Sequence, residues 1–420
     1  MIHDPIRPAS QSSAAYSDYT HYNLQNAEPV APLGLVALPG SRSFVELVDQ
    51  HLGERRRAWF ERSDSLIRLD SGELRETYIL DADAIRFATG EGKGQFNVSV
   101  RGHDLFIFCD VMNHSVTYTM WGQQVSMSPD EHFQDLVRLI LAATGKAKRI
   151  NVIMPFLYES RQDVRQSRES LDCAYMLKEL AMLGVDNIIT FDPHDPRIEN
   201  ALPRQSVENI PVSYRLIQSL LITYPDIRLK GKKSLMVVSP DESGMKRSMF
   251  YATILELPFG TFYRQRKHAR ASADNNEVVD YKFLGDEPGG RDVLIVDDMI
   301  NTGASVVETS ERLKRMGARR VFCLCTFPLF VEGIGLIDEA VRRGYIDRVF
   351  CTNLIYRRPE LLAAPWYTDV DVSSFVTLLV DAINYNLSIA KLIDQKETIR
   401  EIIGLHQQAQ NMLDLASRHD

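Results

Sequence analysis

The sequence predicts an α/β protein with two similar domains, each a mainly parallel sheet flanked by helices. Short apolar runs of strand length alternate with segments that place apolar residues on one helix face. This alternation occurs twice along 420 residues, a length that can bury two cores. Strands that alternate with helices form parallel sheets, and functional loops gather at the carboxyl ends of those strands.

The first half alternates strands with helices. The elements expected there, in chain order, are the strand 103–108, the helix face Phe133, Leu136, Val137, Leu139 and Ile140, the strand 149–156, the helix 171–183 and the strand 186–191. The second half repeats the pattern. Its expected elements are the strand 234–239, the helix 245–255, the strand 293–296, the helix 305–316 and the strand 320–326. Each half therefore predicts its own sheet.

Composition shifts along the chain suggest four parts. Residues 1–32 are rich in Ser, Ala, Pro, Tyr and Asn and are expected to form a disordered leader. We place an N-terminal domain at 33–215 and a C-terminal domain at 216–390. Residues 391–420 carry spaced apolar residues among charges, which predicts a terminal amphipathic helix that packs on the core or on a partner chain.

Charge and cysteine content exclude several classes of protein. The net charge of −8 argues against a nucleic-acid binder, although a local cluster of cations can still hold a small anion. No run approaches the roughly 18 apolar residues that a membrane helix needs, and no signal peptide is visible. The five cysteines form no disulfide pattern, and Cys323 and Cys325 suit a buried strand face better than a metal site. We expect a cytoplasmic protein.

The segment 293–305 is the most informative. Residues 293–296 predict a buried strand, and Asp297 and Asp298 follow at its carboxyl end. Since carboxylates repel phosphate, the acid pair suits the other end of a sugar phosphate. Ribose hydroxyls donate hydrogen bonds there, and a bridging Mg²⁺ accepts carboxylate oxygen.

A polar loop then opens directly into a helix. Backbone N–H groups at the helix start can hold a phosphate, and Thr302 and Ser305 add hydroxyl donors. Gly303 lets the backbone approach a ligand closely. Acid pair and loop together describe a cradle for ribose 5-phosphate. The alternative is a capping box of Ser305 and Glu308 beside two incidental acids.

With this acid pair and loop, the sequence resembles the phosphoribosyltransferase superfamily, and within it the ribose-phosphate diphosphokinase (PRPP synthetase) family, over roughly residues 84–390. The resemblance implies two phosphoribosyltransferase-like domains that transfer the diphosphoryl group of ATP to O1 of ribose 5-phosphate. It also implies Mg²⁺ and a homo-oligomer based on dimers, up to a hexamer. It assigns the ribose 5-phosphate to Asp297, Asp298, Asn301, Thr302, Gly303, Ala304 and Ser305.

Two further segments resemble family loops that contact ATP. In the first, an aromatic side chain stacks on the adenine of ATP bound to the neighbouring subunit. The ATP contacts implied by both segments are Phe87, Thr89, Gly90, Glu91, Arg161 and Gln162. Without the resemblance, Phe87 would suit a core and the second segment a solvated loop.

The resemblance implies metal ligands at His194 and Asp241. His194 ends a predicted strand, and Asp192 could orient it. Lys246 and Arg247, which follow Asp241, fit solvated helix charges equally well. Where the family carries further acids downstream of the histidine, this chain has neutral residues at 209 and 213.

A basic run at 263–270 resembles the family's mobile loop, whose cations meet the transferring diphosphate. Arg264 stands at the position of the family's Lys, and Arg266 at that of its Arg, so we expect Arg264, Arg266 and His194 to be catalytic. A cation that arrives on loop closure stabilises charge as it develops. Arg lacks the compact geometry of Lys, and Lys267 could substitute. The alternative is a solvated basic loop.

Two other functions stay open. A transferase that consumes PRPP would share the loop at 297–305 but would not need the ATP segments. A catalytically weak or inactive regulatory subunit is also possible. Three departures from the family pattern keep this alternative open. They are Arg264, the absence of the further acids, and Asn301, where much of the family has an acid.

Overall fold

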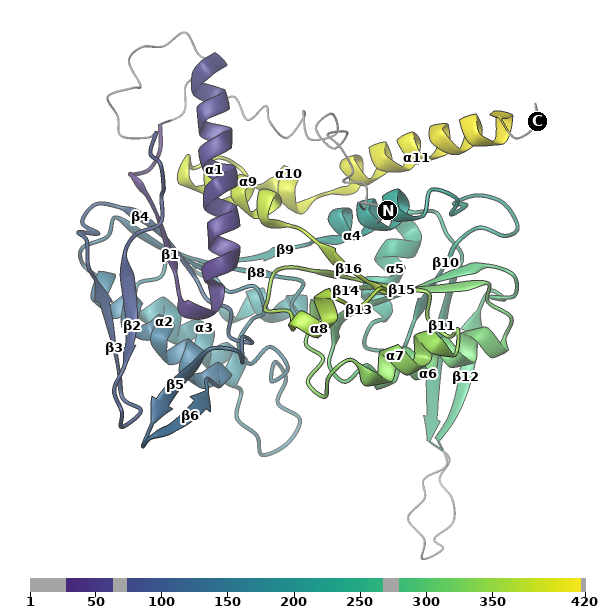
Figure 1. The fold of residues 1–420 in the computed structure, drawn as a ribbon, viewed down its shortest axis with the longest axis horizontal. Helices are drawn as coiled ribbons and strands as arrows, with labels where there is room; N and C mark the ends of the chain where they lie inside the picture. Colours follow the sequence, from purple (N-terminus) through teal and green to yellow (C-terminus); the bar gives the residue numbers. More distant parts are fainter. Residues whose placement is uncertain (1–27, 63–73, 267–278, 417–420) are drawn as a thin grey trace, which may run out of the picture.

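The computed structural model describes residues 28–62, 74–266 and 279–416, and it contains two sheets that lie side by side (Figure 1). The first sheet is parallel throughout, in the order β1-β4-β7-β8-β9. Its strands are β1 (Leu33–Ala37), β4 (Asp104–Phe108), β7 (Arg149–Ile153), β8 (Asn187–Phe191) and β9 (Ser206–Ile210). Every residue of β4 is buried, as expected for a central parallel strand.

Three helices accompany this sheet: α1 (Arg42–Arg62), α2 (Pro129–Ala143) and α3 (Asp172–Met182). Helix α2 begins with a capping box, in which Glu131 N donates to Ser128 Oγ over 3.3 Å and Ser128 N donates to Glu131 Oε2 over 2.8 Å. The predicted apolar face of α2 is buried, which confirms that helix. The short 3-10 helices η4 (Pro39–Ser41) and η6 (Pro196–Ala201) complete this half.

Two hairpins project beside α2: β2 (Ala82–Arg86) with β3 (Gly92–Phe96), and β5 (Thr117–Met120) with β6 (Gln123–Ser126). A buried ion pair of 2.9 Å between Arg86 Nη2 and Asp135 Oδ1 ties the first hairpin to α2. A backbone hydrogen bond of 2.9 Å from Trp121 N to Ala88 O joins the two hairpin tips. The sequence had predicted neither hairpin.

The second sheet has the order β12-β11-β10-β13-β14-β15-β16 and is parallel except for β12. Its strands are β10 (Met236–Ser239), β11 (Phe259–Arg266), β12 (Val279–Gly285), β13 (Asp292–Ile300), β14 (Arg320–Pro328), β15 (Arg348–Thr352) and β16 (Tyr367–Val370). Cys323 and Cys325 are buried on β14, so the predicted pair of core thiols is confirmed. The α/β class with two mainly parallel sheets is confirmed as well.

The helices around the second sheet are α4 (Ser213–Thr223), α5 (Met245–Ile254), α6 (Ala304–Arg315), α7 (Gly335–Arg342) and α8 (Pro359–Leu362). Helix α9 (Ser373–Asn384) instead returns to the first half and packs along α1 (Figure 1). There Arg56 Nη2 donates to Asp381 Oδ1 over 3.0 Å, and both side chains are buried. The domain boundary near residue 215 stays a prediction, since the chain crosses between the sheets more than once.

The chain ends in α10 (Ala390–Ile393) and α11 (Lys396–Ala416). Helix α11 lies over α4 and α5 and buries its own Ile399 and Ile402. Val30 N donates to Asn384 O over 2.8 Å, so the described chain is bound to the core a few residues before the expected start at Leu33. Most of the predicted leader, and Lys267, lie outside the described residues. Among the described helices, none combines the length and apolar character needed to cross a membrane.

Candidate active site

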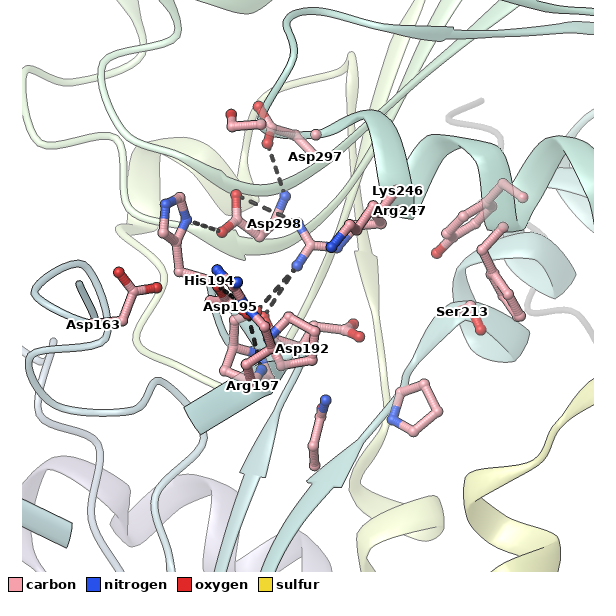
Figure 2. Close-up of a pocket in the computed structure, with 18 of the residues that line it drawn as sticks. Asp163, Asp192, His194, Asp195, Arg197, Ser213, Lys246, Arg247, Asp297 and Asp298 are labelled. Atoms are coloured by element: carbon pink, nitrogen blue, oxygen red, sulfur yellow. Dashed lines mark hydrogen bonds and ion pairs between the residues drawn. The ribbon is translucent and has the colours of Figure 1, made fainter. Parts of the chain in front are cut away.

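A cavity of about 610 Å³ lies where the carboxyl ends of both sheets face each other. Residues after β8 and β9 form one side, and residues of α5 and the end of β13 form the other (Figure 2). Predicted residues that line it are His194, Asp297 and Asp298. The two sheets therefore bring His194 and the acid pair into one cavity, whereas the predicted phosphate loop at residues 301–305 does not line it.

His194 and Asp298 form the link between the sheets. His194 Nδ1 donates to Asp298 Oδ2 over 3.0 Å, and the His194 side chain is 38% exposed toward the cavity. The hydrogen bond to Asp298 raises the pKa of His194 above its ordinary value. Burial raises the pKa of Asp298, but the hydrogen bond from His194 and the charge of Arg247 outweigh it and lower that pKa to about 2.

Arg247 holds the same carboxylate from the opposite side. Its Nη1 lies 3.5 Å from Asp298 Oδ1, and its Nη2 donates to the carbonyl oxygens of Asp192 and Pro193 over 3.4 and 3.3 Å. Figure 2 shows the guanidinium pointing between these groups. Despite burial, the nearby carboxylates raise the pKa of Arg247. The guanidinium therefore stays a fixed cation in the cavity wall.

Asp192 stands behind this cluster. It has a φ of 36°, a left-handed conformation uncommon for a residue with a side chain. Its Oδ2 accepts hydrogen bonds from Thr326 Oγ1 over 2.8 Å and from Val212 N over 3.4 Å. Asp192 is thus bonded to Thr326 of the second sheet, and Asp298 rather than Asp192 makes the hydrogen bond that orients His194.

The acid pair is asymmetric. Burial and the neighbouring charge of Asp298 raise the pKa of Asp297 well above the ordinary range. Asp298 N also donates to Asp297 Oδ1 over 2.9 Å. Strand β13 continues to Ile300, so both acids belong to the strand rather than to the loop after it. The pair combines a firmly ionised carboxylate with a neighbour that binds a proton more readily.

The loop after β13, which the sequence predicts to hold a phosphate, turns directly into α6. Gly303 caps α6 with a φ of 86°, and a Cβ at this position would lie 3.1 Å from Ile337 Cδ1. Ala304 N donates to Thr302 Oγ1 over 3.3 Å. Helix α6 begins at Ala304, so Ser305 lies inside the first turn and does not cap this helix. Asn301 and Thr302 are half-buried, whereas Ala304 and Ser305 are exposed.

Asp241 is placed apart from His194. Its Oδ1 accepts from Ser243 N over 2.9 Å, from Ser243 Oγ over 2.6 Å and from Gly244 N over 3.1 Å, just before α5. It lines a small hollow with Ser305, while Ser243 and Gly244 line the main cavity. The two predicted metal ligands therefore follow strands of different sheets and line different hollows.

The donor set fits a metal that arrives with a substrate. Within the described residues, no group of three His, Cys, Asp or Glu side chains could hold an ion. Mg²⁺ keeps several waters and commonly binds one or two carboxylates together with substrate phosphates. His194, oriented through Nδ1 by a carboxylate, has the arrangement of a ligand histidine.

The predicted ATP residues lie outside this cavity. Phe87 is 49% exposed at the tip of the β2–β3 hairpin, where the turn closes through Phe87 N to Glu91 O over 2.8 Å and Gly90 N to Phe87 O over 2.9 Å. Thr89 Oγ1 donates to Glu91 Oε2 over 3.0 Å. The exposed Phe87 is not part of the first core.

The second ATP segment lies between β7 and α3. Arg161 is exposed, and Gln162 Nε2 donates to Ser170 O over 2.9 Å. Of this loop, only Asp163 lines the cavity. The exposure of Arg161 agrees with the alternative of a solvated loop. An ATP contact at Arg161 therefore stays a prediction.

Arg264 and Arg266 lie on β11, where the backbone pairs them with Tyr281 and Val279 of β12. Their side chains are outside the described part of the structure. The sequence missed Arg247, which it left open as a solvated charge. The sequence feature that could have identified Arg247 is its position in the first turn of α5, the helix that follows the Asp241 loop.

Comparison with known proteins matches both halves. A model of the N-terminal domain of ribose phosphate pyrophosphokinase matches residues 34–184, and one of the phosphoribosyl transferase domain matches residues 204–353. The ribose-phosphate pyrophosphokinase of Mycoplasma pneumoniae is 31% identical over 274 residues, 64% of this chain and 74% of that protein. That of Vibrio cholerae is 28% identical over 318 residues, 75% of this chain and 91% of that protein.

The fold also has a solved counterpart. The crystal structure of phosphoribosylpyrophosphate synthetase from Mycobacterium smegmatis superimposes with a TM-score of 0.66 at 20% identity. The match covers 84% of this chain and 99% of that one. The similarity confirms the two-domain fold that the sequence resemblance implied.

Proposed function

The chain belongs to the ribose-phosphate pyrophosphokinase family, and from that premise we propose that it transfers the diphosphoryl group of ATP to O1 of ribose 5-phosphate, giving PRPP and AMP. The observation that carries the proposal is the convergence of His194 and Arg247 with Asp297 and Asp298 in one cavity. These residues come from both sheets, and each side supplies what one of the two substrates needs.

The sugar-phosphate side follows from β13 and its loop. Asp298, firmly ionised, and Asp297 accept hydrogen bonds from ribose hydroxyls. The first-turn N–H groups of α6 and the hydroxyls of Thr302 and Ser305 hold the 5-phosphate. Ribose 5-phosphate bound in this way directs its O1 hydroxyl toward the cavity.

The nucleotide side consists of cations that face a triphosphate. His194 in the cavity and Asp241 in the separate hollow would each offer a ligand to Mg²⁺ that arrives with the triphosphate, and the bound metal would neutralise charge on the phosphate oxygens. O1 attacks the β-phosphorus, the bond from that phosphorus to the oxygen bridging the α-phosphate breaks, and AMP leaves. The hydroxyl proton passes to water. Arg264 and Arg266 stabilise the charge that develops, so positioning and neutralisation do most of the work.

We place ATP contacts at the exposed tip of the β2–β3 hairpin in a second copy of the chain. Phe87 is exposed there and does not line the cavity of its own chain, which supports a contact across subunits. The proposed assembly is a homo-oligomer based on dimers. The cytoplasmic location expected from the sequence stays a prediction.

The test is to incubate purified protein with Mg²⁺, ATP and ribose 5-phosphate and to measure AMP and PRPP together. Equal amounts of both products, lost in Asp298→Asn and Asp241→Ala, support the synthetase. A PRPP-consuming transferase releases no AMP under these conditions.

Two observations favour a second candidate, a regulatory subunit. The turn at Pro211–Ser213 that lines the cavity has no carboxylate, and Arg replaces the usual Lys at 264. A regulatory subunit would form no AMP alone and would alter the rate of an active family member when the two are mixed. Rate enhancement without intrinsic turnover would therefore replace the synthetase proposal.

A further inference from the structure

The segment that joins α10 to α11 forms part of the cavity wall. The matched family domains end at residue 353, yet Ile393, Asp394 and Gln395 line the same cavity as His194 and Asp298. In Figure 1 this segment passes beside α4 before α11 runs along the edge of the molecule. Chain beyond the matched domains is thus built into the site.

Gln395 has a buried side chain, 3% exposed, and both ends of its amide are engaged. Its Oε1 accepts from Ser213 Oγ over 3.2 Å and from Tyr214 N over 3.0 Å. Its Nε2 donates to Pro211 O over 2.7 Å and to Leu392 O over 3.2 Å. One amide therefore holds both sides of the turn at residues 211–214, where β9 passes into α4.

That turn is itself a wall of the site. Pro211 and Ser213 line the cavity, and Val212 N donates to Asp192 Oδ2 over 3.4 Å. Asp192 in turn is tied through its carbonyl oxygen to Arg247. A shift of the turn would therefore change both the shape of the cavity and the backing of the His194 segment.

We propose that Gln395 is a positioning residue for the reaction, acting through the turn at residues 211–214. The proposal rests on the function proposed above. A buried amide that satisfies donors and acceptors on two sides of a turn fixes its geometry, because leaving those groups unpaired is costly. The turn at residues 211–214 carries no acid that a bound metal could hold in place. The segment that joins α10 to α11 fixes this turn instead, through Gln395.

The polar anchors of α11 itself lie away from the cavity. His406 Nε2 bonds to Ile227 O over 2.8 Å, and Gln410 Nε2 donates to Pro225 O over 3.2 Å. Both bind the chain that follows α4. Gln410 thus offers a matched control, since it is a glutamine of the helix that follows this segment and also donates to backbone carbonyls.

The experiment compares Gln395→Met with Gln410→Met in the full chain. We expect Gln395→Met to lower kcat/KM for ATP by about tenfold, the scale of a lost buried hydrogen-bond pair, and to speed hydrogen exchange at the amides of Val212 and Tyr214. Gln410→Met should change neither. Gln395→Glu keeps the acceptor for Tyr214 N. The Tyr214 amide should therefore exchange more slowly in Gln395→Glu than in Gln395→Met.

Two outcomes overturn the proposal. In the first, the two methionine variants show equal decreases in melting temperature and equal decreases in activity. Gln395 would then only anchor α11. In the second, hydrogen exchange at the amides of residues 212–214 is unchanged in Gln395→Met. Because hydrogen exchange needs no turnover, it decides this point even if the protein forms no AMP, and the two proposals fail separately. If Gln395→Met does not fold, Gln395→Glu carries the same comparison.

Discussion

His194 Nδ1 and Asp298 Oδ2 lie 3.0 Å apart although 104 residues separate them in the chain. The pair joins the end of β8 in one sheet to the end of β13 in the other. It sets the distance between the two sides of the cavity, and it makes the ionisation of each side depend on the other.

Asp298→Asn should lower the pKa of His194 toward about 6.5, because the variant replaces the charged hydrogen-bond acceptor that raises it by a neutral amide oxygen. NMR titration of the His194 ring measures this shift. Asp195→Asn is the control, since Asp195 lines the cavity but bonds to Arg197. A His194 pKa that is the same in wild type and Asp298→Asn would contradict the pairing.

The same pair predicts how stability depends on pH. The pKa of Asp298 is lowered, so its contribution is present above its unfolded pKa of about 3.9 and is lost as the pH falls through about 2. The pKa of His194 is raised, so its contribution is complete below about 6.5 and fades as the pH rises through the folded value. The difference in unfolding free energy between wild type and Asp298→Asn should therefore be largest between about pH 4 and 6.5 in urea titrations. A difference that grows above pH 7 would contradict this.

Arg247→Met should destabilise the fold by about 1–3 kcal/mol, because it leaves Asp298 and the carbonyls of Asp192 and Pro193 without their donor. Urea unfolding at neutral pH measures the loss. Arg315→Met, at an exposed i,i+4 ion pair on α6, should cost less than about 0.5 kcal/mol. Equal losses in the two variants would mean that Arg247 is only a solvated helix charge.

Gly303→Ala should raise the KM for ribose 5-phosphate and lower stability by about 1–2 kcal/mol, since its φ of 86° is costly with a side chain and its Cβ would press on Ile337. Gly344 has a φ of 74°, and a Cβ added there would meet no atom within 4 Å. Gly344→Ala should therefore cost similar stability and leave the KM unchanged. If both variants shift the KM alike, the loop does not hold the phosphate.

Arg264→Met should lower kcat by about 10²-fold with a smaller effect on the KM for ATP, because a cation that acts mainly in the transition state changes kcat. Arg264→Lys should keep most of the activity. Lys282→Met, an exposed cation on β12 of the same hairpin, is the control. Wild-type kcat in Arg264→Met would shift the catalytic role to Lys267.

Phe87→Ala and His194→Ala should each abolish most activity, and mixing the two variants should restore part of it if each site combines the hairpin of one copy with the cavity of another. Subunit exchange followed by AMP measurement tests this. A mixture no more active than its components would place both residues in one chain's site.

The sequence predicts the central elements well because continuous apolar runs and amphipathic periodicity are local properties. The strand ending at Phe191 and the buried face of α2 agree with that reasoning. Helix α1 carries many charges and little amphipathic signal, so its packing on α9 had to be seen in three dimensions. Arg247 and Gln395 take their roles from partners distant in the chain, which no local pattern encodes.

The most direct test uses ATP that carries ³²P at the β-phosphorus, with ribose 5-phosphate and Mg²⁺, followed by chromatographic separation of the products. The account predicts AMP and PRPP in equal amounts, the label in the diphosphate of PRPP, and no turnover once Mg²⁺ is removed by a chelator. Release of ADP instead of AMP, or no AMP at any concentration of Mg²⁺ and phosphate, would contradict diphosphoryl transfer by this chain.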